Sequence, residues 1–287
     1  MDLEAARVEQ MRPGHFACPG CSVALAMRLA LRALGEKTIA VIIPSCSSII
    51  AGTYPNTAIK VPAFHTTFET AAPAAAGISY GLTLQGIDDT TVVAFAGDGG
   101  TFDIGLQSLS GAADRNEHFI YVCLDNEAYM NTGIQAGSAT PRSAWTVTTP
   151  TGRLFRKKKI MDIIVAHRVP YAATASTGDP RDLMEKVEKA RSIQGMKFIH
   201  VLTPCATGWR MEERLSAQAA ILAVETRLFP LYEVFEGKTY VLTHEPQGLP
   251  IENYLSIQGR YRHLTREQIR VMQAEVDEEW SALLKRL

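Results

Sequence analysis

The sequence predicts an α/β fold, with a mainly parallel sheet covered by helices. Short apolar runs rich in β-branched residues alternate with helical patterns over about the first 200 residues, and this alternation is typical of βαβ units. After Phe229 the alternation stops, which sets the last part of the chain apart. The strands expected from the apolar runs are 38–43, 91–96, 118–124, 171–175 and 197–202.

The helices are predicted from apolar residues spaced three or four positions apart. Segment 22–34, for example, places Leu25 and Leu29 opposite Arg28 and Arg32. The expected helices are 22–34, 71–84, 104–113, 161–167 and 180–193. Near the end of the chain, the pattern predicts a short hairpin within 229–246 and a charged helix over 265–287.

Composition limits the classes of protein that the chain can represent. Its 287 residues are 46% hydrophobic, enough for a large core, and a formal net charge of −1 gives no general attraction to nucleic acid or anionic membranes. The N-terminus lacks an apolar signal region, and no run of eighteen apolar residues occurs. We therefore expect a cytoplasmic protein without a membrane span, whose five cysteines are thiols or ligands instead of disulfides.

A glycine-rich turn is the first candidate site. Gly97, Asp98, Gly99 and Gly100 follow an apolar strand and open a helix, so backbone N–H groups there suit a diphosphate while the Asp98 carboxylate suits a divalent cation. Asn126 ends the next strand, where it offers a second oxygen ligand and a nearby backbone carbonyl offers a third. Neighbouring parallel strands bring both loops to one edge of the sheet. Two ordinary βα turns are the alternative interpretation.

The cysteines form the second candidate site. Cys18 and Cys21 lie in a CPGC segment, which alone is consistent with a redox dithiol at a helix N-terminus, half of a zinc site or chance. Cys46 and Cys205 each follow a predicted strand at the same sheet edge as the glycine turn. Four converging thiols favour an iron–sulfur cluster or zinc. Cys123 lies inside a predicted strand and is expected to be a core residue.

Several motifs together resemble a known family. GDGGTFDIGLQSLSGAADRN at 97–116 and DNEAYMNTGIQAGSATPRSAWTVTTP at 125–150 are similar to the thiamine-diphosphate-binding β subunit of 2-oxoacid:ferredoxin oxidoreductases, which include pyruvate synthase. CPGC, PSCSSI and TPCATGW resemble the cysteine motifs of that family. The resemblance covers about residues 13–209. It implies a thiamine-diphosphate-binding fold for 1–209, with 210–287 as an extension that packs on this domain or on a partner.

The resemblance also implies roles for individual residues. Four thiolates would hold one [4Fe–4S] cluster: Cys18, Cys21, Cys46 and Cys205, with Cys46 also beside the thiamine. Three oxygen ligands would hold Mg²⁺ on the diphosphate: Asp98, Asn126 and the Ala128 carbonyl. Backbone N–H groups facing the diphosphate would come from Gly97, Gly99 and Gly100. Asn131 would lie near the thiazolium as a catalytic residue that hydrogen-bonds a substrate-derived oxygen.

The implied activity is thiamine-dependent oxidative decarboxylation of a 2-oxoacid. Electrons would pass through the [4Fe–4S] cluster to ferredoxin or another acceptor, and coenzyme A would take the acyl group. Pyruvate is the leading expectation, with branched-chain, aryl and dicarboxylic 2-oxoacids and oxalate left open. In this family the glutamate that activates the thiamine belongs to another subunit, so companion chains (alpha, gamma and a ferredoxin-like delta) are expected.

Two other functional classes each explain part of the sequence. A non-oxidative thiamine decarboxylase or synthase needs the diphosphate turn but not the cysteines. An interaction subunit with a four-cysteine zinc site needs the thiols but not Asp98 and Asn126. The run 153–159, with five basic residues in seven, is consistent either with docking of a partner, an electron acceptor or coenzyme A phosphates, or with a solvated loop.

Overall fold

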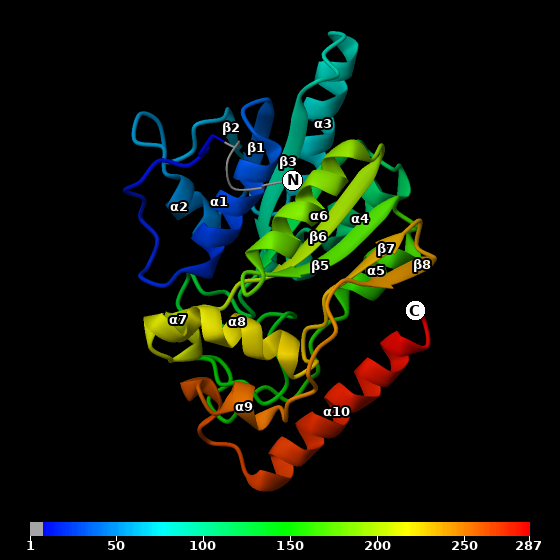
Figure 1. Cartoon of the computed structure of the whole chain (residues 1–287). Coiled ribbons are helices and arrows are strands. Elements are labelled where there is room, and N and C mark those ends of the chain that lie inside the picture. Colours follow the sequence, from blue (N-terminus) through cyan, green and yellow to red (C-terminus); the bar gives the residue numbers. More distant parts are fainter. Residues whose placement is uncertain (1–7) are drawn as a thin grey trace.

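An eight-stranded sheet forms the centre of the molecule (Figure 1), which is described here from a computed structural model for residues 8–287. The strand order is β2-β1-β3-β4-β6-β5-β7-β8. Strands β1 to β6 run parallel, and β7 and β8 are antiparallel additions at one edge. The strands are β1 Thr38–Ile42, β2 Ala63–His65, β3 Thr91–Gly97, β4 Phe119–Asp125, β5 Tyr171–Ser176, β6 Met196–Leu202, β7 Tyr232–Phe235 and β8 Thr239–Leu242. The predicted fold class is confirmed.

Helices cover both faces of this sheet. They are α1 Ser22–Leu34, α2 Cys46–Ala51, α3 Ala71–Leu84, α4 Leu106–Asp114, α5 Ile160–Ala166, α6 Pro180–Ser192, α7 Ala206–Trp209, α8 Ser216–Glu225, α9 Glu252–Leu255 and α10 Arg266–Leu284. A π-helix spans Gly99–Ile104, and 3₁₀ turns span Glu213–Leu215 and Gly259–Tyr261. No helix within residues 8–287 is both long and apolar enough to cross a membrane.

Successive strand residues feed two separate cores. In β3, Val93 and Phe95 pack with α1 and α6 on one face, while Val92 and Ala94 pack with α3, α4 and α5 on the other. This alternation follows from the two-residue period of a strand. Because both faces of the central parallel strands β1, β3, β4, β5 and β6 are largely buried, these strands are mostly apolar, and local patterns predict them. Cys123 is fully buried in the second core, as expected.

The last part of the chain completes the sheet and builds a third core. The predicted hairpin is present, and β7 pairs with β5. Helices α7, α8, α9 and α10 gather their apolar side chains around Leu202 and Trp209, beyond the ends of the strands. In Figure 1, α10 lies diagonally across the lower part of the molecule. The helical part of the chain after residue 209 therefore packs next to the sheet edge at which the parallel strands end, whereas β7 and β8 extend the sheet itself.

The helix expected at 104–113 is preceded in the structure by a π-helix, and the α-helix α4 itself begins at Leu106. The chain coils directly after Asp98, first as the π-helix, in which the Gly105 N–H donates to the Gly100 carbonyl 2.9 Å away. The Thr101 hydroxyl donates to the Gly97 carbonyl at 2.9 Å and ties this first turn to β3. Such π turns are frequent at functional sites. The short elements α2 and β2 and the helix α8 were not predicted, since none carries a long periodic pattern.

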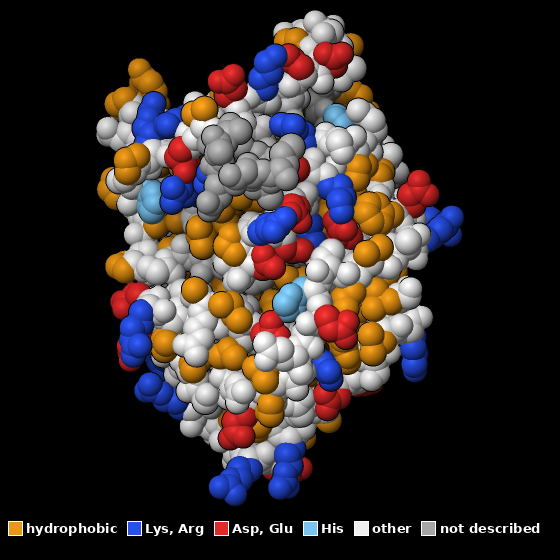
Figure 2. All heavy atoms as spheres, viewed as in Figure 1, with side chains coloured by type: hydrophobic (Ala, Val, Ile, Leu, Met, Phe, Trp, Pro, Cys, Tyr) orange, Lys and Arg blue, Asp and Glu red, His pale blue; other side chains and the backbone are white. Residues whose placement is uncertain are grey.

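The basic run 153–159 is engaged within the fold. Lys157 forms ion pairs with Asp125 at 2.5 Å and Glu127 at 2.9 Å. Arg156 and Lys159 pair with glutamates of α10, at 3.2 Å to Glu275 and 3.3 Å to Glu279. The run thus links α10 to the loop after β4 through ion pairs. Figure 2 shows charges of both signs interspersed on one face of the molecule, in keeping with the small net charge.

Candidate functional site

The candidate site lies where four neighbouring parallel strands end. Strands β1, β3, β4 and β6 are adjacent in the sheet, and their carboxyl ends lead into Cys46, Asp98, Asn126 and Cys205. Register confirms the alignment, because Gly97 of β3 pairs with Leu124 of β4. The residues singled out in the sequence therefore share one edge of the sheet, the usual ligand-binding edge of α/β folds.

A cavity of about 280 Å³ opens at this edge. Its walls come from the strand ends, the first turn of the π-helix and the loop after β4. They include all of the residues expected to contact thiamine diphosphate or its metal: Cys46, Gly97, Asp98, Gly99, Gly100, Asn126, Ala128 and Asn131. Asn131 is exposed at this wall, whereas Asp98 and Asn126 are 4% and 5% exposed.

The polar groups in the cavity suit a divalent cation. Burial raises the pKa of Asp98 well above 3.8, and the nearby Asp125 carboxylate raises it further. The Asn126 Oδ1 atom is buried and has no hydrogen-bond partner in the structure. The Ala128 carbonyl accepts one hydrogen bond from Met130 N at 2.8 Å, which leaves a lone pair free. A hard cation satisfies such oxygens and stabilises ionised Asp98, so these residues fit Mg²⁺.

The glycines keep the cavity floor free of side chains. A Cβ atom on Gly99 would lie 2.3 Å from Cε1 of Tyr129, and one on Gly100 would lie 2.3 Å from Cδ1 of Ile43. Tyr129 is held in place by a 2.7 Å hydrogen bond from its hydroxyl to Asp103. Backbone N–H groups in the first turn of a helix lack intrahelical acceptors. This surface therefore fits a phosphate group approaching the backbone closely.

Of the four candidate cluster cysteines, Cys46 lies in the cavity wall, and the other three are near enough to Cys46 to influence its pKa. Cys21 caps α1, Cys46 opens α2, and Cys205 caps α7 while accepting a hydrogen bond from Gly208 N at 3.3 Å. Cys18 is exposed, in the same short turn as Cys21, whose N–H donates to the Cys18 carbonyl at 3.2 Å. Cys46 lies in the cavity wall with its Sγ 4.0 Å from Asn126 Nδ2.

These thiols are close enough to affect one another. Burial, followed by the charges of Cys205 and Cys21, raises the pKa of Cys46 to about 12. Burial also raises the pKa of Cys205, with further contributions from Cys21 and Cys18. Four thiolates at this position therefore need a positive group among them, which fits an iron–sulfur cluster. Within residues 8–287, however, no three His, Cys, Asp or Glu side chains are gathered tightly enough to hold one metal ion.

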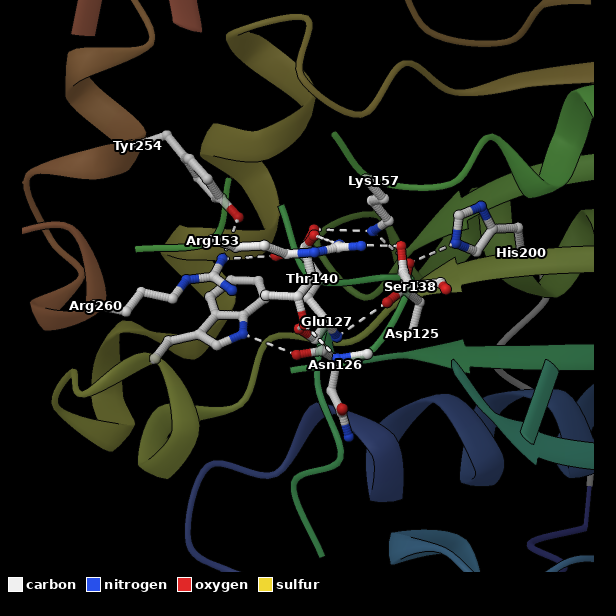
Figure 3. A network of polar contacts seen from close by, with 12 residues as sticks. Asp125, Asn126, Glu127, Ser138, Thr140, Arg153, Lys157, His200, Tyr254 and Arg260 are labelled. Atoms are coloured by element: carbon white, nitrogen blue, oxygen red, sulfur yellow. Dashed lines mark hydrogen bonds and ion pairs between the residues drawn. The ribbon is translucent and has the colours of Figure 1, made fainter. Parts of the chain in front are cut away.

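A buried charged network lies behind the cavity and was not predicted (Figure 3). His200 Nε2 is 2.7 Å from Asp125 Oδ2, and Lys157 bridges Asp125 and Glu127. Although burial opposes its ionisation, Lys157 and His200 lower the pKa of Asp125 to about 2. Burial lowers the pKa of His200. The network therefore holds an ionised carboxylate directly before the Asn126 loop.

Three comparisons place the chain among known proteins. Residues 45–201 match the model for the thiamine pyrophosphate enzyme, C-terminal TPP binding domain. The ketoisovalerate oxidoreductase subunit VorB of Pyrococcus furiosus is 47% identical over 289 residues, covering 96% of this chain and 93% of the relative. The pyruvate synthase subunit PorB of Methanothermobacter marburgensis is 48% identical over 274 residues, covering 94% and 95%.

The chain belongs to the thiamine-diphosphate-binding β subunits of the 2-oxoacid:ferredoxin oxidoreductases. A solved 2-oxoglutarate:ferredoxin oxidoreductase from Magnetococcus marinus, with 2-oxoglutarate, coenzyme A and succinyl-CoA bound, shares the fold. Its TM-score is 0.62 at 24% identity, covering 72% of this chain and 70% of that chain. The resemblance seen in the motifs is thus confirmed, and the protein is a subunit of a thiamine-dependent 2-oxoacid oxidoreductase. Membership favours this function over the two alternatives raised by the sequence.

Proposed function

We propose that this subunit binds thiamine diphosphate through Mg²⁺ and carries a [4Fe–4S] cluster beside it, for oxidation of a 2-oxoacid with a short aliphatic side chain. The observation that carries the proposal is the position of Cys46, a thiol in the wall of the cavity that also contains Asp98 and Asn126. The aliphatic substrate class is supported by the relatives, which are named for ketoisovalerate and pyruvate. Pyruvate stays our leading candidate.

In this proposal the chain's own groups bind and orient the cofactor. Asp98, Asn126 and the Ala128 carbonyl would supply the three oxygen ligands of Mg²⁺. The backbone N–H groups of Gly97, Gly99 and Gly100 would face the diphosphate. Asn131 at the cavity wall would donate its amide N–H to an oxygen derived from the substrate. When bound, thiamine diphosphate supplies the decarboxylating chemistry, and an iron–sulfur cluster accepts single electrons.

The cluster ligands would be Cys18, Cys21, Cys46 and Cys205. A four-iron cluster is larger than a single ion and separates its thiolates further, so the thiols need not be gathered as tightly as around zinc. Because Cys46 is 4.0 Å from Asn126, a cluster there would adjoin the metal-binding loop. Such adjacency suits direct electron transfer out of the cavity.

Companion chains would complete the catalyst. The cavity wall within the described residues has Asp98 but no glutamate, so the carboxylate that activates the aminopyrimidine of thiamine must come from elsewhere. We propose alpha, gamma and ferredoxin-like delta subunits as partners, coenzyme A as acyl acceptor, and ferredoxin or another carrier as electron acceptor, in the cytoplasm. Residues 1–209 would form the cofactor-binding domain, with 210–287 as an extension that packs on it or on a partner.

The test uses the complex purified without oxygen. Thiamine diphosphate, Mg²⁺ and coenzyme A are supplied, and reduction of a viologen dye is followed with pyruvate, 2-oxoisovalerate, 2-oxoglutarate, phenylglyoxylate and oxalate. We expect a brown complex with broad visible absorbance and the highest kcat/KM for an aliphatic 2-oxoacid. A colourless, zinc-containing complex would refute the cluster, and a preference for 2-oxoglutarate, phenylglyoxylate or oxalate would refute the substrate class.

A further inference from the structure

Glu127 lies between two of the three proposed magnesium ligands and has an unusual backbone conformation. Its φ angle is +70°, in the left-handed region that residues other than glycine rarely adopt. Its neighbours Asn126 and Ala128 both line the cofactor cavity, whereas Glu127 lines a second cavity of about 240 Å³ beneath α10. With Glu127 in this conformation, Asn126 and Ala128 face the cofactor cavity, and the Glu127 carboxylate faces the second cavity.

Four hydrogen bonds hold Glu127 in this conformation (Figure 3). Its N–H donates to Asp125 Oδ1 at 2.9 Å, and its carbonyl accepts from Thr140 Oγ1 at 2.7 Å. Its Oε1 accepts from Lys157 at 2.9 Å, and its Oε2 accepts from Arg260 at 2.6 Å. Backbone strain of this kind persists only where the surroundings impose it, and it often accompanies a functional site.

Arg260 contacts the loop that contains Asn126 and Glu127 both directly and through Trp209. It lies in the C-terminal part of the chain, is 2% exposed, and pairs with the buried Glu127 carboxylate. Its guanidinium also stacks over the Trp209 ring, 3.9 Å from the centroid. The Trp209 indole N–H in turn donates to the Asn126 carbonyl at 2.9 Å. One arginine therefore contacts the Glu127 side chain directly and, through Trp209, the peptide unit between Asn126 and Glu127.

Arg260 is itself well oriented for this task. Its Nε donates to Gln258 at 2.8 Å, and a terminal nitrogen donates to the Tyr254 hydroxyl at 3.1 Å. A buried guanidinium held by three hydrogen bonds is a rigid fork, which loses little freedom when it binds a carboxylate. Outer partners of this type orient metal ligands in proteins.

We propose that Glu127 and Arg260 are positioning residues of the metal and diphosphate site, through which the segment after residue 209 holds the cofactor loop in its binding geometry. This inference rests on the proposed function, since it takes Asn126 and Ala128 as metal ligands. It gives the C-terminal segment a specific task at the cofactor site in addition to its packing against the sheet.

The test measures metal affinity directly. Mn²⁺ replaces Mg²⁺ in the oxidised complex with thiamine diphosphate. The concentration of free Mn²⁺ is measured by electron paramagnetic resonance, and the titration gives its Kd. We expect Arg260→Met and Glu127→Ala to weaken Mn²⁺ binding by about 10- to 100-fold. Glu127→Gly should bind Mn²⁺ more tightly than Glu127→Ala, because glycine adopts a positive φ without strain. If only the loss of the Glu127 carboxylate mattered, Glu127→Gly and Glu127→Ala would bind Mn²⁺ equally weakly.

Two further variants separate a specific effect on the metal site from misfolding or a general loss of stability. Trp209→Phe keeps the ring beneath Arg260 but removes the donor to Asn126, and we expect weaker Mn²⁺ binding from it also. Arg286→Met breaks an ion pair with Asp162 (2.6 Å) just beyond the C-terminal end of α10 and should leave Mn²⁺ affinity unchanged. The proposal is overturned if Arg260→Met, Trp209→Phe and Glu127→Ala all bind within twofold of wild type while Asp98→Ala binds poorly. If Asp98→Ala also binds normally, the metal site itself is misassigned.

Discussion

Adding one methyl group at Gly99 should damage the cofactor cavity. In Gly99→Ala the new Cβ would lie 2.3 Å from Cε1, 2.7 Å from Cδ1 and 3.0 Å from Cζ of Tyr129. The ring cannot turn aside freely, since its hydroxyl bonds Asp103 at 2.7 Å and its face packs near Phe68. Tyr129 and Gly99 both line the cavity, so relief of the clash must change the cavity's shape.

The magnitude follows from the cost of overpacking. An extra methyl group in a well-packed site costs about 1–3 kcal/mol, and breaking a hydrogen bond to a carboxylate costs about 1.5–3 kcal/mol. The better helix propensity of alanine returns at most about 1 kcal/mol. If about 1–3 kcal/mol of this cost weakens cofactor binding, the affinity for thiamine diphosphate drops by about 5- to 150-fold.

The assay is calorimetric titration of thiamine diphosphate into the anaerobic complex at saturating Mg²⁺. Gly111→Ala is a matched control, because its Cβ would meet only Arg115 Nη1 at 3.3 Å, the end of a flexible side chain. That variant should bind normally and gain up to about 1 kcal/mol of stability. Binding by Gly99→Ala within twofold of wild type would refute the close-approach argument.

Three other predictions concern the metal ligand Asp98, the companion subunits and the buried Lys197. Asp98→Ala should abolish Mg²⁺-dependent thiamine diphosphate binding but keep the iron content, and an unchanged calorimetric affinity would disprove this ligand role. The isolated chain, reconstituted with all cofactors, should oxidise 2-oxoacids negligibly until companion subunits are added; full turnover by the chain alone would contradict this. Burial lowers the pKa of Lys197 to about 7 from 10.5, with His118 Nδ1 3.4 Å away. The unfolded state therefore binds more protons between pH 7 and 10, and stability should rise with pH across that window. Lys197→Met should flatten the rise in melting temperature from pH 7 to 9, and parallel curves for the two proteins would rule the effect out.

Local sequence patterns predicted the sheet and the position of the candidate residues. Parallel strands buried on both faces leave mostly apolar runs, and their ends place Asp98, Asn126, Cys46 and Cys205 at one edge. The π-helix was not predictable in this way, since glycines after a strand are compatible with several turns. Its form depends on contacts with Tyr129 and Ile43 from other strands' loops.

The charged network was missed for a different reason. Glu127 pairs with Lys157 and Arg260, which are 30 and 133 residues away in the chain, so no local pattern links them. One signal was available in the sequence, because His200 interrupts the apolar run of β6 between Ile199 and Val201. A buried polar side chain needs a partner, and here that partner is Asp125.

The most direct test of a cluster joined to a thiamine site compares two cysteines. Iron content and the reduced-state electron paramagnetic resonance signal are measured for Cys205→Ala and Cys123→Ala in the anaerobic complex. Cys205 lies at the sheet edge, whereas Cys123 is fully buried in β4, where its loss should cost about 1 kcal/mol or less. We predict that Cys205→Ala loses iron and the normal signal while Cys123→Ala retains both. Four irons and an unchanged signal in Cys205→Ala, with their loss in Cys123→Ala, would contradict the ligand set.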